Sequence, residues 1–210
     1  MKARPLLFSA PMIRALLAGR KTQTRRLVKY THPLGDPAKW SAEATTETLA
    51  WAGANSYCPH GRPGDHIWVK ETFAPSVSHP DALTMPEYDG GKNPAHLYYR
   101  ADVRNGQIDG CDADRIKWKP SIFMPRWASR ITLEVDDVRV EKLSSISEED
   151  AKAEGVKLTR CTHPDCSPGS CAASSYRGAY AVLWNEINGA TAPWGADPFV
   201  WVITFRVLDA

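Results

Sequence analysis

The chain contains no uninterrupted apolar run of about 18 residues, the length that a membrane-spanning helix needs. Its N-terminal region also lacks the apolar core and small-residue cleavage site of a secretory signal peptide. The five cysteines are an odd number, which argues against a complete disulfide framework and fits a reducing compartment. We therefore expect a globular cytoplasmic protein without a membrane partner.

Acidic residues are absent from the first 30 positions. This segment holds eight basic residues, namely Lys2, Arg4, Arg14, Arg20, Lys21, Arg25, Arg26 and Lys29. The other 180 residues hold 18 basic and 24 acidic side chains, a net charge of −6. Such asymmetry indicates an anionic partner bound near the N-terminal segment, with a solvated basic face as the alternative.

Repeated strand–helix–strand units are also absent, and the pattern is one of short strands with isolated helices. Alternating apolar residues predict strands at 5–9, 22–28, 66–73, 97–101, 129–143 and 199–207. Helical spacing predicts helices from Pro11 to Gly19, from Ser147 to Glu154 and from Tyr176 to Ile187. A slip in the alternation at Asp136 and Asp137 predicts a β-bulge.

These elements predict an α+β fold, a small and mainly antiparallel β-barrel with short helices at its ends. A length of 210 residues fits one domain over 1–210. Three stretches rich in turn-forming residues and without periodicity are expected to be loop insertions, at about 30–60, 74–96 and 157–175.

Several motifs occur in a characteristic order. Gly-Arg-Lys-Thr-x-Thr-x-Arg at 19–26 follows the first strand and helix, Pro-Gly-Asp at 63–65 precedes a strand, and Ile-Ser-Glu-Glu-Asp-Ala at 146–151 begins a helix that ends in Glu154-Gly155. A closing strand covers 200–206. This order resembles the ASCH domain, a branch of the PUA-like β-barrel superfamily. Phe-Ser-Ala-Pro-Met at 8–12 and Met-Pro-Arg-Trp-Ala-Ser-Arg at 124–130 are similar to phage- and prophage-encoded members.

The resemblance implies an RNA-related role. Some members of the family are amidohydrolases that deacylate acylated cytidine, and others are described as ribonucleases. In the amidohydrolase branch a lysine, a threonine and a later glutamate form the catalytic group, and these match Lys21, Thr24 and Glu154. We expect a hydrolase of an amide or phosphodiester on RNA or a modified nucleoside. The alternative is a non-catalytic RNA-binding module in a phage or host complex.

The chemistry of these three residues leaves more than one assignment open. A neutral Lys21 could take the proton of the Thr24 hydroxyl if its pKa fell by about 3 units from 10.4. Instead, Glu154 could be the general base while a charged Lys21 stabilises a developing oxyanion, or Glu154 could only orient the lysine. We prefer Glu154 as the base because it needs no large fall in the lysine pKa. The structural alternative for Thr24 is a β-branched strand residue.

Two further groups are candidates for ligand contact or metal binding. Phosphate and base contacts are expected from Arg20, Arg25, Arg26, Lys119, Arg126, Trp127 and Arg130. Four residues that can bind zinc lie within 11 positions: Cys161, His163, Cys166 and Cys171. Their spacing differs from that of a standard zinc knuckle, so the candidates are a structural zinc site, a loop with reduced thiols and a disulfide between two of the cysteines. A small zinc-stabilised interaction domain is a third functional alternative.

Overall fold

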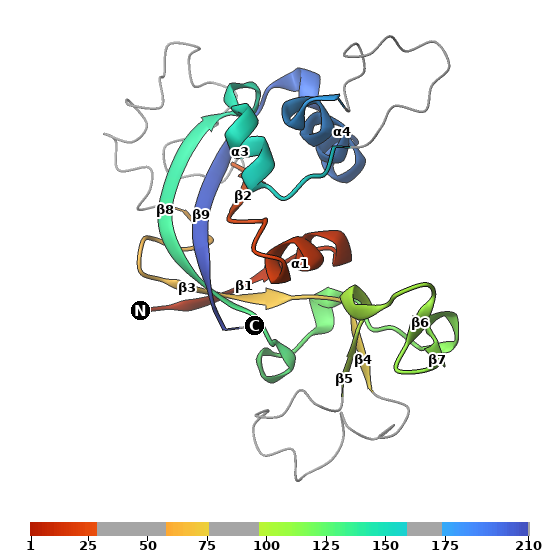
Figure 1. The fold of residues 1–210 in the computed structure, drawn as a ribbon. Coiled ribbons are helices and arrows are strands. Elements are labelled where there is room, and N and C mark those ends of the chain that lie inside the picture. Colours follow the sequence, from red (N-terminus) through yellow and green to blue (C-terminus); the bar gives the residue numbers. More distant parts are fainter. Residues whose placement is uncertain (29–57, 76–96, 159–173, 210) are drawn as a thin grey trace, which may run out of the picture.

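The structure is a computed structural model, and it describes residues 1–28, 58–75, 97–158 and 174–209 (Figure 1). Most of each expected insertion lies outside these ranges, as do Cys161, His163, Cys166 and Cys171. No helix in the described ranges has the length and apolar character needed to cross a membrane.

A five-stranded sheet forms the centre of the fold (Figure 1). Its strands are β1 (Ala3–Leu7), β2 (Gln23–Leu27), β3 (His66–Lys70), β8 (Thr132–Lys142) and β9 (Phe199–Asp209). They are ordered β1-β3-β8-β9-β2. The β1–β3 pair is parallel and the other neighbours are antiparallel, so the sheet is mainly antiparallel, as predicted.

The long β8–β9 pair curves across the sheet and carries much of the core. Leu133 and Val135 are buried on one side of the bulge, and Val138 and Val140 are buried beyond it. The register shifts between Val135 and Asp137, which confirms the predicted bulge. Because one extra residue is absorbed there, the inward alternation resumes in phase and both apolar halves of β8 reach the same core.

The helices begin and end where the sequence indicates. In α1 (Ala10–Leu17), Pro11 lies in the first turn, and Gly19 just beyond the helix has a φ of +64°. Before α3 (Glu148–Ala153), the Ser147 side chain accepts a hydrogen bond from the backbone N–H of Asp150. In α4 (Tyr176–Asn188), Tyr180 and Trp184 are buried against the sheet.

A closed barrel is not found in the described part of the chain, so the expected barrel is not confirmed. The sheet is open, with β1 and β2 at its two edges. A side chain bridges the edges, because the Arg26 guanidinium on β2 donates to the Leu7 carbonyl oxygen on β1 at 2.6 Å. The chain forms a mixed α/β structure with a five-stranded sheet and few helices, and its open edges define a seam between β1 and β2.

A second packing unit lies beside the sheet and uses short elements. It contains the pairs β4 (Phe73–Pro75) with β5 (Leu97–Tyr99) and β6 (Gln107–Ile108) with β7 (Cys111–Asp112). The strand predicted at 66–73 is divided at Glu71, whose buried carboxylate pairs with Arg130 at 2.9 Å. The predicted strand at 97–101 ends early, in a 3-10 turn at Arg100–Asp102.

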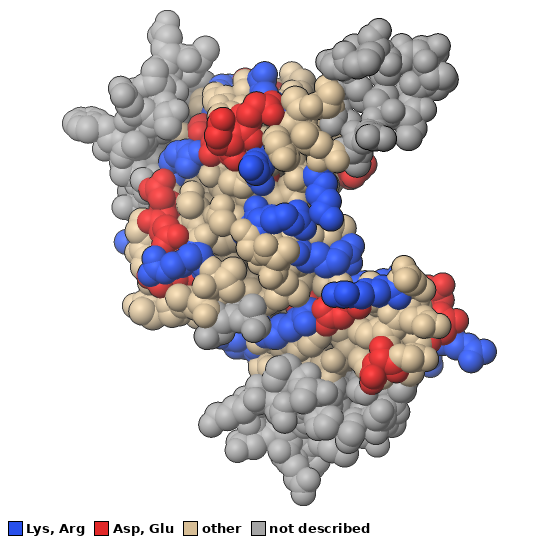
Figure 2. All heavy atoms as spheres, viewed as in Figure 1, with Lys and Arg blue, Asp and Glu red and all other residues tan. Residues whose placement is uncertain are grey.

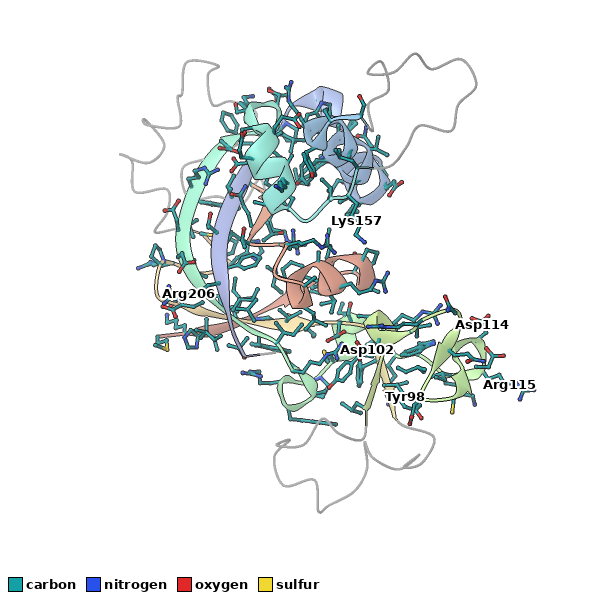
Figure 3. All side chains as sticks on the ribbon, in the orientation of Figure 1. Tyr98, Asp102, Asp114, Arg115, Lys157 and Arg206 are labelled. Carbon is teal, nitrogen blue, oxygen red and sulfur yellow. The ribbon has the colours of Figure 1, made fainter. Side chains whose placement is uncertain are left out.

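Figure 2 shows that one face of the molecule is hollowed between the part that carries α4 and the part that carries β4 to β7, with many basic side chains around the hollow. Other charged residues lie away from it. Figure 3 places Arg206 on the far side of the sheet, where it pairs with Asp136 at 2.7 Å, and Arg115 at the outer tip near β6 and β7.

Candidate functional site

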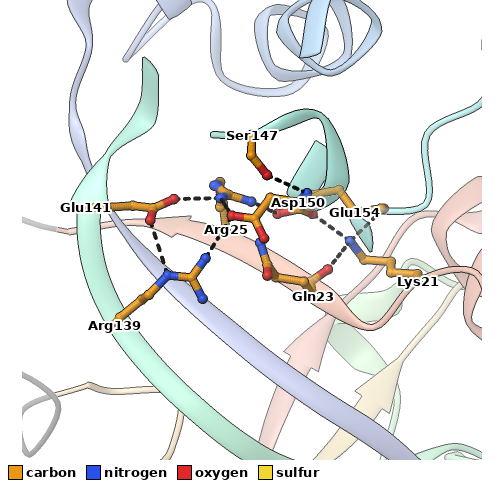
Figure 4. A network of polar contacts seen from close by, with 8 residues as sticks. All are labelled: Lys21, Gln23, Arg25, Arg139, Glu141, Ser147, Asp150 and Glu154. Atoms are coloured by element: carbon orange, nitrogen blue, oxygen red, sulfur yellow. Dashed lines mark hydrogen bonds and ion pairs between the residues drawn. The ribbon is translucent and has the colours of Figure 1, made fainter. Parts of the chain in front are cut away.

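Lys21 and Glu154 lie together although 133 residues separate them in the sequence (Figure 4). The lysine Nζ is 2.7 Å from Glu154 Oε2, and the two residues also form an isolated β-bridge. The side chains of Lys21 and Glu154 are 0% and 2% exposed, respectively. Two of the three residues implied by the family resemblance therefore form a buried ion pair.

The Lys21 Nζ has three oxygen acceptors, which matches an ammonium group. Besides Glu154 Oε2, it donates to the Glu154 carbonyl oxygen at 2.9 Å and to the Gln23 carbonyl oxygen at 2.8 Å. A neutral amine has only two N–H donors, so its lone pair would face one of these oxygens. Burial lowers the pKa of Lys21, while the Glu154 carboxylate opposes that change. The geometry favours the ammonium, and all three of its donors are occupied.

Behind this pair, Arg25 joins Glu154 to a larger ionic network (Figure 4). Its guanidinium is 3.3 Å from Glu154 Oε1, 2.5 Å from Glu141 and 2.9 Å from Asp150. Arg139 closes the network through Glu141 and Asp150. Three basic and three acidic groups thus balance one another, as buried charges require. The Arg25 side chain is fully buried, so it holds Glu154 in place and is not open to a ligand.

The turn after α1 positions Lys21. The backbone N–H groups of Arg20 and Lys21 both donate to the Ala15 carbonyl oxygen, at 2.9 and 3.1 Å. Thr22 then donates to the Ala153 carbonyl oxygen at 2.9 Å, which attaches this turn to the end of α3. Gly155 follows Glu154 with a φ of +83°, a conformation that other residues rarely adopt. The lysine and glutamate are therefore placed by two turns that bond to each other.

We expect Gly155→Ala to disturb the site and destabilise the fold. A Cβ at Gly155 would lie 2.8 Å from the Ala15 Cβ and 3.0 Å from the Lys21 Cβ. Backbone strain should cost about 1–2 kcal/mol and overpacking a further 1–3 kcal/mol or so in the free energy of unfolding, measured by urea denaturation. Gly64→Ala is a matched control, because its φ is +84° and nothing lies within 4 Å of the added Cβ. Equal losses in the two variants would contradict close packing at Gly155.

A pocket of about 330 Å³ lies in the seam between β1 and β2, under α4. Thr24 and Arg26 of β2, Leu6 and Leu7 of β1, and Glu154 are among its lining residues. Thr24 and Glu154, two of the expected catalytic residues, therefore border one pocket. Lys21 does not line this pocket, and it contacts Glu154 from behind.

Two further features of this pocket were not anticipated from the sequence. Tyr180, expected only as an apolar helix-face residue, lines the pocket together with Glu154. Burial and the Glu154 carboxylate hold the pKa of Tyr180 well above its usual value, so its phenol is neutral. The Arg26 Nε is buried and has no hydrogen-bond partner within the described residues. The sequence signal for this role of Tyr180 is its place on an otherwise apolar helix face, because a buried tyrosine hydroxyl usually needs a polar neighbour.

A second pocket of about 480 Å³ adjoins the first between α1 and α4. The two share Met12, Glu154 and Leu183 as lining residues, so they adjoin, and we call the two together the cleft. The second pocket is lined by three exposed basic side chains from separate segments, namely Arg14, Arg20 and Lys157. We call this the basic pocket and the first the seam pocket.

The other expected ligand-binding residues lie elsewhere. Lys119, Arg126, Trp127 and Arg130 line neither pocket. Arg130 pairs with Glu71 and Asp102, and its guanidinium lies 4.0 Å from the centre of the Tyr99 ring. Its charge thus stabilises the second packing unit. Of the seven expected contacts, Arg20, Arg25 and Arg26 line the cleft, and of these the Arg25 side chain is fully buried and paired with three carboxylates.

The Pro63-Gly64-Asp65 turn precedes β3, as the motif order predicts, and holds the start of β1 against it. The Asp65 carboxylate accepts from the Lys2 backbone N–H at 3.0 Å and pairs with Arg4 at 2.6 Å. These hydrogen bonds lower the pKa of Asp65 to about 2. The turn contributes to the parallel edge of the sheet and lines neither pocket.

Within the described ranges, no group of three or more His, Cys, Asp or Glu side chains is placed to hold a metal ion. The predicted zinc ligands lie outside those ranges. Of the cysteines that are described, Cys58 and Cys111 are free thiols. Burial raises the pKa of the Cys58 thiol to about 11, which disfavours the thiolate that metal binding needs.

No family model matches the chain, and no curated protein matches its sequence. Among solved structures, the fold is similar to that of protein EF3133 from Enterococcus faecalis V583, described by the family-model DUF984. The two are 12% identical, with a TM-score of 0.40, over all of this chain and 77% of that one. A likeness at this level carries no argument about function.

Proposed function

We propose that this chain is an ASCH-type member of the PUA-like superfamily and that its seam pocket binds a nucleoside and hydrolyses an amide on the base. The observation that carries the proposal is the convergence of Thr24 and Glu154 on one pocket, with Lys21 fixed to the glutamate from behind. The seam pocket, at about 330 Å³, is within the size range of small-molecule sites.

Glu154 is the general base in this proposal. It takes a proton from water or from the Thr24 hydroxyl, and the resulting oxygen nucleophile attacks the amide carbonyl carbon. The tetrahedral intermediate then collapses as the amide C–N bond breaks, and the amine leaves with the proton that Glu154 received. With water as the nucleophile this step releases the carboxylic acid directly. With Thr24 as the nucleophile the acyl group remains as an ester on Thr24, and a water molecule deprotonated by Glu154 hydrolyses that ester, which releases the acid and returns the proton to the Thr24 oxygen. Lys21 and Arg25 keep the carboxylate in place throughout.

Oxyanion stabilisation belongs to Arg26 in this scheme. The sequence favours a charged Lys21 for that role, but the three donors of Lys21 are occupied by Gln23 and Glu154. The Arg26 Nε has no partner among the described residues, and Arg26 lines the pocket with Thr24. A donor that gains its partner only when negative charge develops stabilises the transition state selectively.

Thr24→Val tests the proposal, since valine keeps the β-branched shape and removes the hydroxyl. The substrate is cytidine acetylated at its exocyclic amine. We expect turnover of this compound to fall by about 100-fold, measured chromatographically as cytidine released. Thr22→Val is the matched control, because Thr22 is exposed and its backbone bonds are unchanged. Equal turnover by wild type and Thr24→Val would remove the hydroxyl from the mechanism.

A non-catalytic RNA-binding module is the second candidate. It is favoured by the burial of Glu154 and the occupied donors of Lys21, which a purely structural ion pair would also require. In that case oligonucleotides bind with strong salt dependence, and neither acetylcytidine nor RNA yields a product. Product formation by the wild type, lost in Thr24→Val, excludes it.

A further inference from the structure

The cations that line the basic pocket have different partners from the five arginines that form ion pairs in the described part of the chain. Arg4, Arg25, Arg130, Arg139 and Arg206 each pair with at least one carboxylate. In the basic pocket, by contrast, Arg14 donates to the Ala101 carbonyl oxygen and Arg20 to the Gly155 carbonyl oxygen, both at 3.2 Å. Neither of these two has a carboxylate partner among the residues that the structure describes, and the same holds for Lys157.

The three cations come from separate segments that face one pocket. Arg14 is on α1 and Arg20 is in the turn after it, while Lys157, which Figure 3 labels, follows α3. The backbone bonds of Arg14 and Arg20 leave most of each guanidinium fork free. Glu186 is the acidic lining residue outside the Lys21 network, so the pocket carries a net charge of about +2.

The floor between these cations is apolar, and two of its residues, Met12 and Leu183, also line the adjoining seam pocket. A ligand can therefore place an uncharged ring in the seam and an anionic group among the cations. Arginine forks match phosphate oxygens in a bidentate manner, and a phosphate monoester carries up to two negative charges. The charge and donor geometry of the basic pocket complement such a group.

We propose that the basic pocket binds the phosphate of a nucleotide whose base occupies the seam pocket. This inference rests on the proposed function and makes its substrate a phosphorylated nucleoside, either free or at the end of an RNA.

The test is calorimetric binding of acetylcytidine and of its monophosphate ester to the full chain. We expect the monophosphate to bind the wild type at least tenfold more tightly, and Arg20→Ala to remove most of that difference while leaving nucleoside binding unchanged. Arg14→Ala and Lys157→Ala should act in the same direction. Arg115→Ala is the matched control, an exposed arginine far from the cleft (Figure 3).

Each outcome separates this inference from the function on which it rests. If the nucleoside binds and is hydrolysed but the monophosphate binds no more tightly, the phosphate subsite is wrong and the proposed function stands. If the monophosphate advantage survives in all three pocket variants, the subsite is also wrong. If neither compound binds, both proposals fail. A phosphate-ended short RNA that binds more tightly than the monophosphate assigns the subsite to RNA ends, and weaker binding assigns it to free nucleotides.

Discussion

Replacing Lys21 by methionine is expected to lower the free energy of unfolding by about 3–5 kcal/mol, because removal of one partner leaves a buried carboxylate without its main counter-charge. The loss also leaves the Gln23 and Glu154 carbonyl oxygens without the hydrogen bonds that Lys21 donates. Urea denaturation followed by circular dichroism measures this change in the free energy of unfolding.

Lys152→Met provides the control for that experiment. Lys152 is exposed on α3, so its replacement should change stability by no more than about 0.5 kcal/mol. The double variant Lys21→Met/Glu154→Gln should be more stable than the sum of the single effects predicts, since the second change removes the uncompensated charge. An unchanged unfolding midpoint in Lys21→Met, or strict additivity, would contradict a strong buried pair.

Glu154→Gln should have the largest effect on catalysis. The amide keeps the shape of the side chain but cannot take a proton, so turnover of acetylated cytidine should fall by about 10²- to 10⁴-fold. Nucleoside affinity should change little, because the pocket walls are unaltered. The measurement is kcat from product release, together with calorimetric affinity for the same compound.

Glu149→Gln is the matched variant, an exposed carboxylate on the same short helix. It should retain wild-type kcat. A circular dichroism spectrum and an unfolding curve for Glu154→Gln show whether the fold survives the partial loss of its network. A folded Glu154→Gln protein with undiminished kcat would exclude Glu154 as the base.

The ends of the helices and the bulge in β8 could be predicted from the sequence because each depends on residues that are close neighbours in the chain. Gly19 ends α1, Ser147 caps α3 and the phase slip at Asp136 marks the bulge, and all three act within a few residues. The parallel pairing of β1 with β3 was not predicted, since nothing near Ala3 indicates that His66 is its partner. Strand pairing over such separations is decided by tertiary packing.

The basic run at 19–26 shows what a charge pattern alone does not predict. As a charge pattern it predicts an exposed edge, yet Lys21 and Arg25 are buried, whereas Arg20 is exposed and Arg26 is half-buried. Lys21 and Arg25 are buried because they pair with Glu141, Asp150 and Glu154, which lie more than 100 residues away in the sequence. The family resemblance paired Lys21 with Glu154, but the surrounding network had no signal in either segment alone.

The distance between Lys21 and Glu154 along the chain also constrains when the site can exist. β2 has its only sheet neighbour among the described strands in β9, which ends at Asp209. Both edges of the seam precede residue 28, but the strand that holds β2 in the sheet begins at Phe199. During translation the basic N-terminal segment is therefore made before its acidic partners, and the cleft forms only after β9 has been synthesised.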